Sequence, residues 1–185
     1  MEIKDIVLIS LFAAITAVLA LFPPITLPLI PAPITAQTLG VMLAGGILGS
    51  KRGFLSITLF LVLVFIGLPL LPGGGGGISV FFGLTGGFLI SWPLAAYLMG
   101  WLVEKNWHHL SRVKIFFMCL VSGIGVVYLI GVPWLSYMAN MSLASAFIGS
   151  SVFIVGDTVK AMIASSIIFA ISNYYPMIKQ PSKDK

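Results

Sequence analysis

Charged residues are absent from long stretches of this chain, and this distribution constrains the possible fold more than any other feature. Residues 6–50, 53–103, 115–156 and 161–178 contain no Asp, Glu, Lys or Arg. A helix needs about 20 mostly apolar residues to cross a hydrocarbon core of about 30 Å. Of the 185 residues, 59% are hydrophobic and 8% are charged, whereas soluble domains carry about 25% charged residues. These features exclude a soluble enzyme domain, a nucleic-acid-binding module and a disordered tail, and they indicate a polytopic membrane protein.

Proline and glycine clusters divide the apolar stretches into six predicted membrane-spanning helices. Prolines recur between positions 23 and 33, where each removes a backbone donor and bars a regular helix. Glycines interrupt the chain again at 73–77 and at 83–87. The predicted fold is an all-α integral membrane protein with one domain over residues 1–185. Its helices are expected at 6–22, 35–48, 54–71, 88–103, 115–130 and 151–172, with a long loop over 131–150.

The basic residues predict the orientation, because short cytoplasmic loops carry an excess of Lys and Arg. With the N-terminus in the cytoplasm, every basic residue except Lys160 falls in a cytoplasmic segment. These residues are Lys4, Lys51, Arg52, Lys105, Arg112, Lys114, Lys179, Lys183 and Lys185. We therefore expect a multi-pass protein of the cell membrane with both termini in the cytoplasm. The proline- and glycine-rich loops then face outward, where a ligand would arrive.

Asp157 and Lys160 are the charged residues inside a predicted span. An ionised side chain in the bilayer costs at least about 2.5–3.5 kcal/mol and commonly marks a functional site. Residues spaced i,i+3 share one face of a helix, so the two side chains are expected to lie together near the outer end of the last helix. They form either a mutually neutralising structural pair or a polar floor that binds a ligand.

Two further features are candidates for ligand binding. The tract Gly73–Gly77 and the break around Gly86 and Gly87 flank the start of the fourth helix. Glycine-rich backbone lets amides approach and bind an anionic or carbonyl group, although such a tract can also be a plain connector. The amide of Gln37 is expected either in the pocket or in a bond to another helix.

Aromatic and small residues are predicted mainly to anchor and pack the helices. The outer aromatic residues Trp92, Tyr97, Trp134 and Tyr137 are typical of an interfacial belt. Ala13 and Ala17 form a small-xxx-small pair, and Gly45, Gly49 and Gly53 repeat at the same spacing. Such pairs allow close helix approach, within the bundle or against another membrane protein.

No catalytic site, metal site or cofactor is predicted. His108 and His109 lie in the loop 104–114, in a different part of the chain from Asp157. No Ser or Cys nucleophile is visibly paired with a base, and no nucleotide-binding motif follows the glycine tract. The chain is therefore not expected to be an enzyme.

The ordered set of motifs resembles BioY, the family of biotin-specific substrate-binding (S) components of energy-coupling-factor (ECF) transporters. The motifs run through nearly the whole chain in the order found in the family. They are PITAQTL at 33–39, IGLP at 66–69 before the glycines 73–77, TGGFL at 85–89, GVPWL at 131–135 and GDTVKA at 156–161. Phe88 and Val155 depart from the family pattern, which often has tyrosine and proline at the matching positions.

The resemblance implies an outward-facing pocket that binds biotin and delivers it with a separate membrane coupling subunit and two ATPase subunits. Asp157 and Lys160 match the residues that bind the ureido ring, and the glycine tract matches the loop that contacts the ligand and its carboxylate. The biotin-binding residues so predicted are Asp157, Lys160, Gln37, Gly73, Gly74, Gly75, Gly76, Gly77, Gly86, Gly87, Phe88 and Trp134. Ala13 and Ala17 match the surface that docks the coupling subunit.

Two other functions remain open at the level of sequence. A stand-alone ion-coupled carrier would use Asp157 as its proton site. Such a carrier often shows two similar halves with broken helices, and no internal repeat is visible here. A purely structural membrane subunit would bind no small molecule.

Overall fold

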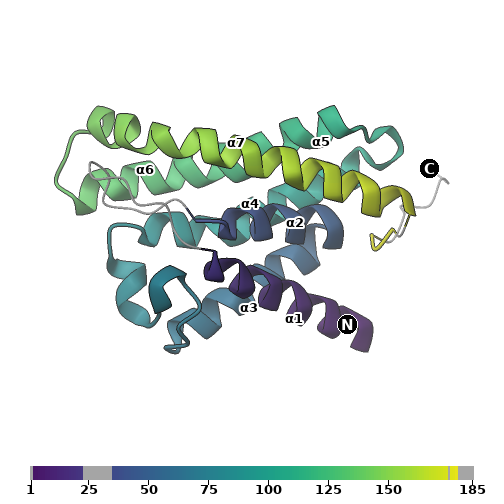
Figure 1. The fold of residues 1–185 in the computed structure, drawn as a ribbon, viewed down its shortest axis with the longest axis horizontal. Helices are drawn as coiled ribbons and strands as arrows, with labels where there is room; N and C mark the ends of the chain where they lie inside the picture. The colour runs from purple at the N-terminus through teal and green to yellow at the C-terminus, as the bar shows by residue number, and fades with distance from the viewer. Residues whose placement is uncertain (1, 23–34, 175, 179–185) are drawn as a thin grey trace.

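The computed structural model describes residues 2–22, 35–174 and 176–178, which form an elongated bundle of helices (Figure 1). The predicted proline-rich connection 23–34 lies outside these residues. The helices are α1 (Ile3–Val18), α2 (Gln37–Leu48), α3 (Ser50–Phe65), α4 (Gly86–Lys105), α5 (Arg112–Cys119), α6 (Val127–Met138) and α7 (Leu143–Tyr174). The π-helical segment Leu120–Val126 joins α5 to α6 in one rod, so the described residues contain the six predicted helical spans.

Four of these spans are long and apolar enough to cross a membrane. They are Ile3–Leu21, Gly86–Lys105, Arg112–Met138 and Leu143–Tyr174. Figure 1 shows the α5–α6 rod beside α7, with α4 and α2 in the middle of the bundle and α1 and α3 on its other side. The protein is thus a multi-pass membrane protein, as the charge distribution predicted.

The short helix α2 lies at the centre of the bundle. Every residue from Gly40 to Leu48 is buried, and a helix that is apolar on all sides belongs in a protein interior. Glycines permit this packing: a Cβ on Gly45 would lie 2.3 Å from the Ala96 carbonyl oxygen of α4, and one on Gly53 would lie 2.7 Å from the Gly45 Cα. The small-residue spacing on α2 and α3 therefore serves contact within the bundle.

Several helix boundaries differ from those predicted, and the helix expected at 54–71 is observed as α3 at Ser50–Phe65. The rod of α5 and α6 extends to Met138 and α7 begins at Leu143, so most of the expected loop 131–150 is helical. Pro133 lies inside α6, just as Pro93 lies inside α4. Proline is tolerated in membrane helices because neighbouring groups and local helix adjustments satisfy the freed backbone groups.

The longer α7 changes the position of the charged pair along its helix. Asp157 and Lys160 lie near the middle of α7, not near its outer end as the shorter predicted helix implied. Serines and small residues fill the buried face of α7, including Ala146, Ser150 and Ala161. The charges are therefore held deep between helices.

The end of the bundle where α1 begins and α7 ends carries Lys51, Arg52, Lys105, Arg112 and Lys114, and we call it the basic end (Figure 1). Arg52 donates to the Leu48 carbonyl oxygen (3.0 Å), to Asp5 Oδ1 (3.3 Å) and to the Met177 carbonyl oxygen. It thereby ties α1, the end of α2 and the segment after α7. Glu104 of α4 accepts from the backbone N–H (2.7 Å) and Oγ–H (2.8 Å) of Ser50.

Candidate ligand-binding cavity

A cavity of about 310 Å³ lies between the starts of α2 and α4, the middle of α7, α6 and the loop after α3. This volume is within the range of small-molecule sites, which are mostly apolar with a few placed polar groups. The lining of this cavity is likewise mostly apolar, with a few polar side chains. The lining residues are Thr35, Gln37, Thr38, Leu71, Pro72, Gly75, Val80, Gly83, Thr85, Phe88, Leu89, Trp92, Val127, Tyr128, Phe153, Asp157 and Lys160.

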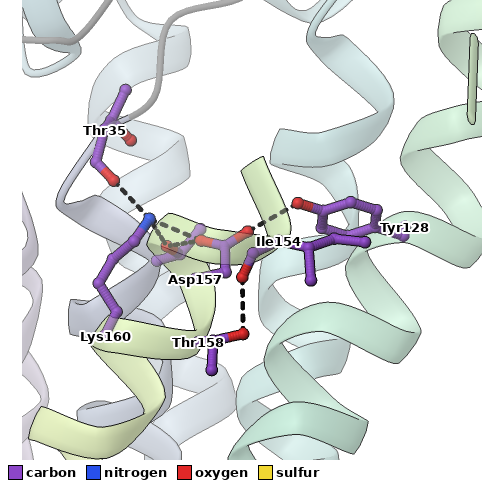
Figure 2. Close-up of polar contacts among 7 residues, drawn as sticks. Thr35, Tyr128, Ile154, Asp157, Thr158 and Lys160 are labelled. Atoms are coloured by element: carbon purple, nitrogen blue, oxygen red, sulfur yellow. Dashed lines mark hydrogen bonds and ion pairs between the residues drawn. The ribbon is translucent and has the colours of Figure 1, made fainter. Parts of the chain in front are cut away.

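Asp157 is the centre of a buried polar network (Figure 2). Its side chain is 7% exposed. Its Oδ1 atom accepts from the Thr38 hydroxyl (3.0 Å) and pairs with Lys160 Nζ (2.6 Å), and its Oδ2 atom accepts from the Tyr128 hydroxyl (2.9 Å). A carboxylate offers about four acceptor sites, so one position on Oδ2 is left for a further donor.

Lys160 donates to acceptors in the first turn of α2 and just before that helix. Its ammonium donates to the Thr35 carbonyl oxygen and to the Thr38 hydroxyl, both at 2.7 Å, in addition to Asp157. Breaking a buried ion pair leaves an uncompensated charge and is strongly destabilising. The sequence prediction that the two residues lie together is confirmed, and both line the cavity.

Gln37 combines the two roles that the sequence left open. Its Nε2 atom donates to the Thr16 carbonyl oxygen (3.1 Å) and to the Leu70 carbonyl oxygen (3.0 Å). Thr16 lies in the last turn of α1, where the backbone carbonyl groups lack intrahelical donors. The amide therefore ties α1 and the loop after α3 to the start of α2. Its oxygen, Oε1, is buried without a hydrogen-bond partner, and the residue lines the cavity.

The glycine tract is an ordered turn at the cavity. Gly73, Gly74 and Gly77 have φ angles of 73°, 76° and 89°, which favour glycine because other residues are strained there. The Leu71 N–H donates to the Gly75 carbonyl oxygen, and the Gly77 N–H donates to the Val64 carbonyl oxygen at the end of α3. Within the tract, Gly75 lines the cavity.

The structure does not bring all of the predicted site residues to the cavity wall. The predicted residues that are not among the lining residues are Gly73, Gly74, Gly76, Gly77, Gly86, Gly87 and Trp134. A Cβ on Gly87 would lie 2.3 Å from the Trp134 side chain, and Trp134 Nε1 donates to the Gly83 carbonyl oxygen (2.9 Å). Gly87 and Trp134 therefore pack behind Gly83, which lines the cavity. Phe88 does line the cavity, with its ring edge-to-face against Tyr128 at 6.1 Å between centroids.

Sequence reasoning missed five polar lining residues, which are Thr35, Thr38, Thr85, Trp92 and Tyr128. Thr35 and Thr38 flank Gln37 in the motif that carries it, and Thr85 begins the motif TGGFL, so both motifs contained lining residues that were not assigned to the site. Tyr128 is 29 positions from Asp157, and no local pattern links the two. Trp92 was assigned to an interfacial belt, but it is 5% exposed and lines the cavity.

Helix α1 turns its predicted docking residues inward. Ala13 is 3% exposed and belongs to the core, and Ala17 is half-buried. The exposed face of α1 instead carries Val7, Leu11 and Ala14. Ala13 is therefore not on the surface that a partner would contact in this structure, because the i,i+4 spacing of small residues does not say which way a stripe faces.

Three comparisons with known proteins agree with one another. A family model described as the BioY family matches residues 1–177. The Biotin transporter BioY of Rhizobium etli is 43% identical over 183 residues, which cover 96% of this chain and 98% of that protein. The Probable biotin transporter BioY of Bacillus subtilis is 42% identical over 172 residues, covering 93% and 92%. A crystal structure described as the S-component for biotin from an ECF-type ABC transporter is similar with a TM-score of 0.90 and 33% identity, covering 95% of this chain and 94% of that one.

Proposed function

The chain belongs to the BioY family, and from this premise we propose that it is the biotin-binding S component of an ECF-type transporter in the cell membrane. Its relatives are named biotin transporters, and the similar crystal structure is described as an S-component for biotin. Such a protein is a transport component and not an enzyme. Biotin is its transported ligand. The similarity to an S component favours this function over the stand-alone ion-coupled carrier.

The observation that carries the proposal is a carboxylate beside an ammonium in the wall of a mostly apolar cavity. The ureido ring of biotin has two N–H donors and one carbonyl acceptor, attached to an apolar bicycle. The open position on Asp157 Oδ2 suits one ureido N–H. Lys160 already has three acceptors, so the ureido carbonyl would replace one of them, such as Thr38 Oγ1. Charge-assisted hydrogen bonds of this kind are about twice as strong as neutral ones.

The glycine tract is proposed to bind the valerate carboxylate. Residues 73–77 carry no side chains that could do so, and their left-handed turns leave backbone amides near the cavity wall at Gly75. Successive backbone amides in such turns form anion-binding concavities. Phe88 supplies apolar contact to the bicycle, and Gly86, Gly87 and Trp134 hold the wall in place.

The remaining subunits are proposed from the S-component description of the similar structure. They are a membrane coupling subunit and two ATPase subunits that drive release of biotin into the cytoplasm. Because Ala13 is buried, the proposed docking surface is the exposed face of α1 with Val7, Leu11 and Ala14. Ala14→Trp should then abolish co-purification with the coupling subunit while leaving biotin affinity unchanged. Retained co-purification would place the docking surface elsewhere.

A calorimetric titration of the purified, detergent-solubilised protein with biotin tests the function directly. Lipoate is the control, because it has a carboxylate on an apolar chain but no ureido group. Tight one-to-one binding of biotin without binding of lipoate is the expected result. No heat of binding from protein that retains its helical circular dichroism would overturn the proposal.

A further inference from the structure

Among the described residues, two basic side chains at the start of α5 have no acidic partner. Arg112 and Lys114 lie in the first turn of that helix, and both are exposed. The salt bridges of the described residues involve Asp5 and Asp157, and Glu104 bonds to the start of α3. The positive charge at the start of α5 is therefore available to an anion from outside the chain.

Arg112 is held across the contact between two helices. Its Cζ atom lies 5.4 Å from the centre of the Phe169 ring on α7, and α5 runs beside α7 (Figure 1). The contact with the ring positions the guanidinium, and its N–H donors have no hydrogen-bond partner among the described residues. A guanidinium presents five such donors in a planar fork that matches the oxygens of a phosphate.

An exposed apolar stripe begins between the two basic side chains. Val113, Phe117 and Val121 form this stripe and are 65%, 58% and 55% exposed, and residues four apart share one face of a helix. At 1.5 Å per residue they extend over about 12 Å, which fits within one leaflet of a hydrocarbon core about 30 Å thick. Val113 lies between Arg112 and Lys114 in the chain, so the stripe runs away from the positive charge along the helix.

The start of α5 is also the edge of an apolar span. The span Gly86–Lys105 ends and the span Arg112–Met138 begins at this turn, and basic side chains at span ends reach the membrane–water interface. Two cations at the interface, with an apolar stripe on the membrane side of them, match a phospholipid, which has a charged phosphate above its acyl chains. We propose that Arg112 and Lys114 bind the phosphate of an anionic phospholipid whose acyl chain lies along the apolar stripe.

The charges at this turn favour an anionic headgroup over a zwitterionic one. Phosphatidylcholine carries its own ammonium group, and the described residues offer it no free carboxylate at this turn. Phosphatidylglycerol brings a phosphate without an ammonium. A basic residue beside a membrane strengthens the binding of anionic lipid about fivefold, so two such residues are expected to strengthen it about 25-fold. The site is separate from the cavity and does not depend on the proposed function.

Lipid titrations followed by native mass spectrometry test the site, because this method counts the lipids bound to the detergent-solubilised protein. Phosphatidylglycerol and phosphatidylcholine with identical acyl chains are compared. The first phosphatidylglycerol is expected to bind the wild-type protein at least about 10-fold more tightly than the first phosphatidylcholine. Equal Kd values for the two lipids would overturn the proposal.

A double variant identifies the residues that bind the phosphate. Arg112→Gln with Lys114→Gln should raise the Kd for phosphatidylglycerol about 20-fold and leave the Kd for phosphatidylcholine within about twofold. Lys4→Gln with Lys51→Gln is the matched control, because these exposed residues lie on α1 and α3, on the other side of the bundle, and the same charge is removed. The control should leave the Kd for phosphatidylglycerol within about threefold. Helical circular dichroism verifies that both variants are folded.

Two results of this experiment would overturn the assignment. An equal loss of phosphatidylglycerol binding in the control variant would mean a diffuse attraction to the whole basic end. An unchanged Kd in the Arg112→Gln, Lys114→Gln variant would exclude the phosphate from this site and leave the two cations to an acidic protein surface.

Two further measurements separate a lipid from a free phosphate compound. Phe117→Ser interrupts the apolar stripe and should weaken the binding of both lipids about fivefold, whereas unchanged binding would remove the acyl chain from the stripe. Glycerophosphoglycerol has the headgroup without acyl chains, and it should not displace phosphatidylglycerol at equal concentration. Displacement would overturn the proposal and make this a site for free phosphate esters.

Discussion

The basic end and the cavity end of the bundle use their polar side chains in opposite ways. At the basic end, Arg52 and Glu104 bond to backbone groups of neighbouring segments. At the cavity end, Asp157 keeps an open acceptor position, and Gln37 and Trp92 keep unpaired atoms. These polar groups of the basic end are bonded within the chain, whereas those of the cavity end retain bonding capacity for a ligand.

Arg52 and Glu104 at the basic end are expected to contribute to stability, and the polar side chains of the cavity end to ligand recognition. A buried polar group that is fully bonded within the protein stabilises the fold, whereas one left unpaired destabilises it until a ligand binds. We therefore expect substitutions at the basic end to lower thermal stability without changing affinity. Substitutions at the cavity end should change affinity first.

The largest effect is expected at Asp157. Asp157→Asn should raise the Kd for biotin by about 10- to 100-fold, because hydrogen bonds to a charged group contribute about 1.5–3 kcal/mol and the amide presents an N–H₂ group to its donors. Calorimetry measures this change. A Kd within threefold of the wild type would remove Asp157 from the ligand site.

A double variant separates the ligand-binding role of this pair from a structural one. Asp157→Asn alone leaves the Lys160 ammonium buried without its counter-ion, which lowers stability. Asp157→Asn with Lys160→Met removes both charges and should recover the Tm while biotin binding stays lost. Recovery of both Tm and affinity would make the pair purely structural and break the comparison of the two ends.

The basic end should show the reverse behaviour at Arg52. Arg52→Met removes bonds to Leu48, Asp5 and Met177, and we expect a loss of about 2 kcal/mol, or about 4–8 °C in Tm. The Kd for biotin should stay within twofold. The control is Lys51→Met, because Lys51 is the exposed neighbour and its loss should change stability by at most about 0.5 kcal/mol. A large loss of affinity in Arg52→Met would mean that the two ends are coupled.

Within the cavity end, the turn of the glycine tract can be distorted without removing a polar side chain. A Cβ on Gly76 would lie 2.3 Å from the Leu68 carbonyl oxygen, so Gly76→Ala must displace the tract that carries Gly75. Overpacking of this size costs about 1–3 kcal/mol, and we expect affinity for biotin to fall about 10-fold. Gly149→Ala is the control, because open space surrounds Gly149 in α7. An unchanged Kd in Gly76→Ala would exclude the tract from the site.

The sequence predicted the charged parts of this arrangement because charge in an apolar span is conspicuous. Asp157 and Lys160 could be placed on one helix face by spacing alone, and six spans followed from the apolar stretches. The extent of α6 could not be predicted in this way, since Pro133 ends a helix in water but is accommodated here. The predicted position of Asp157 along its helix was wrong because α7 begins at Leu143 and not at the predicted position 151.

The neutral polar residues were harder to predict because their roles depend on contacts across the fold. Thr38 contacts Asp157 although the two are 119 positions apart, and no local sequence pattern predicts that contact. Trp92 is of a residue type that is common in interfacial belts, and only its position on α4 beside Phe60 places it in the cavity wall. Ala13 shows the converse: the family resemblance implied that it docks a partner, but packing against neighbouring helices buries it.

The smallest predicted effect is at Glu104, and it tests whether the basic end is purely structural. Glu104 accepts from the backbone and the hydroxyl of Ser50, at the turn where Gly49 has a φ of 87°. Glu104→Gln keeps the shape but weakens charge-assisted bonds to neutral ones, so we expect a loss of about 0.5–1 kcal/mol and a Tm lower by about 1–3 °C. A cycle with Ser50→Ala should show coupling between the two residues, since residues that share a bond are not additive. Biotin titrations of both variants should match the wild type, and a shift in Kd would show that this end takes part in recognition after all.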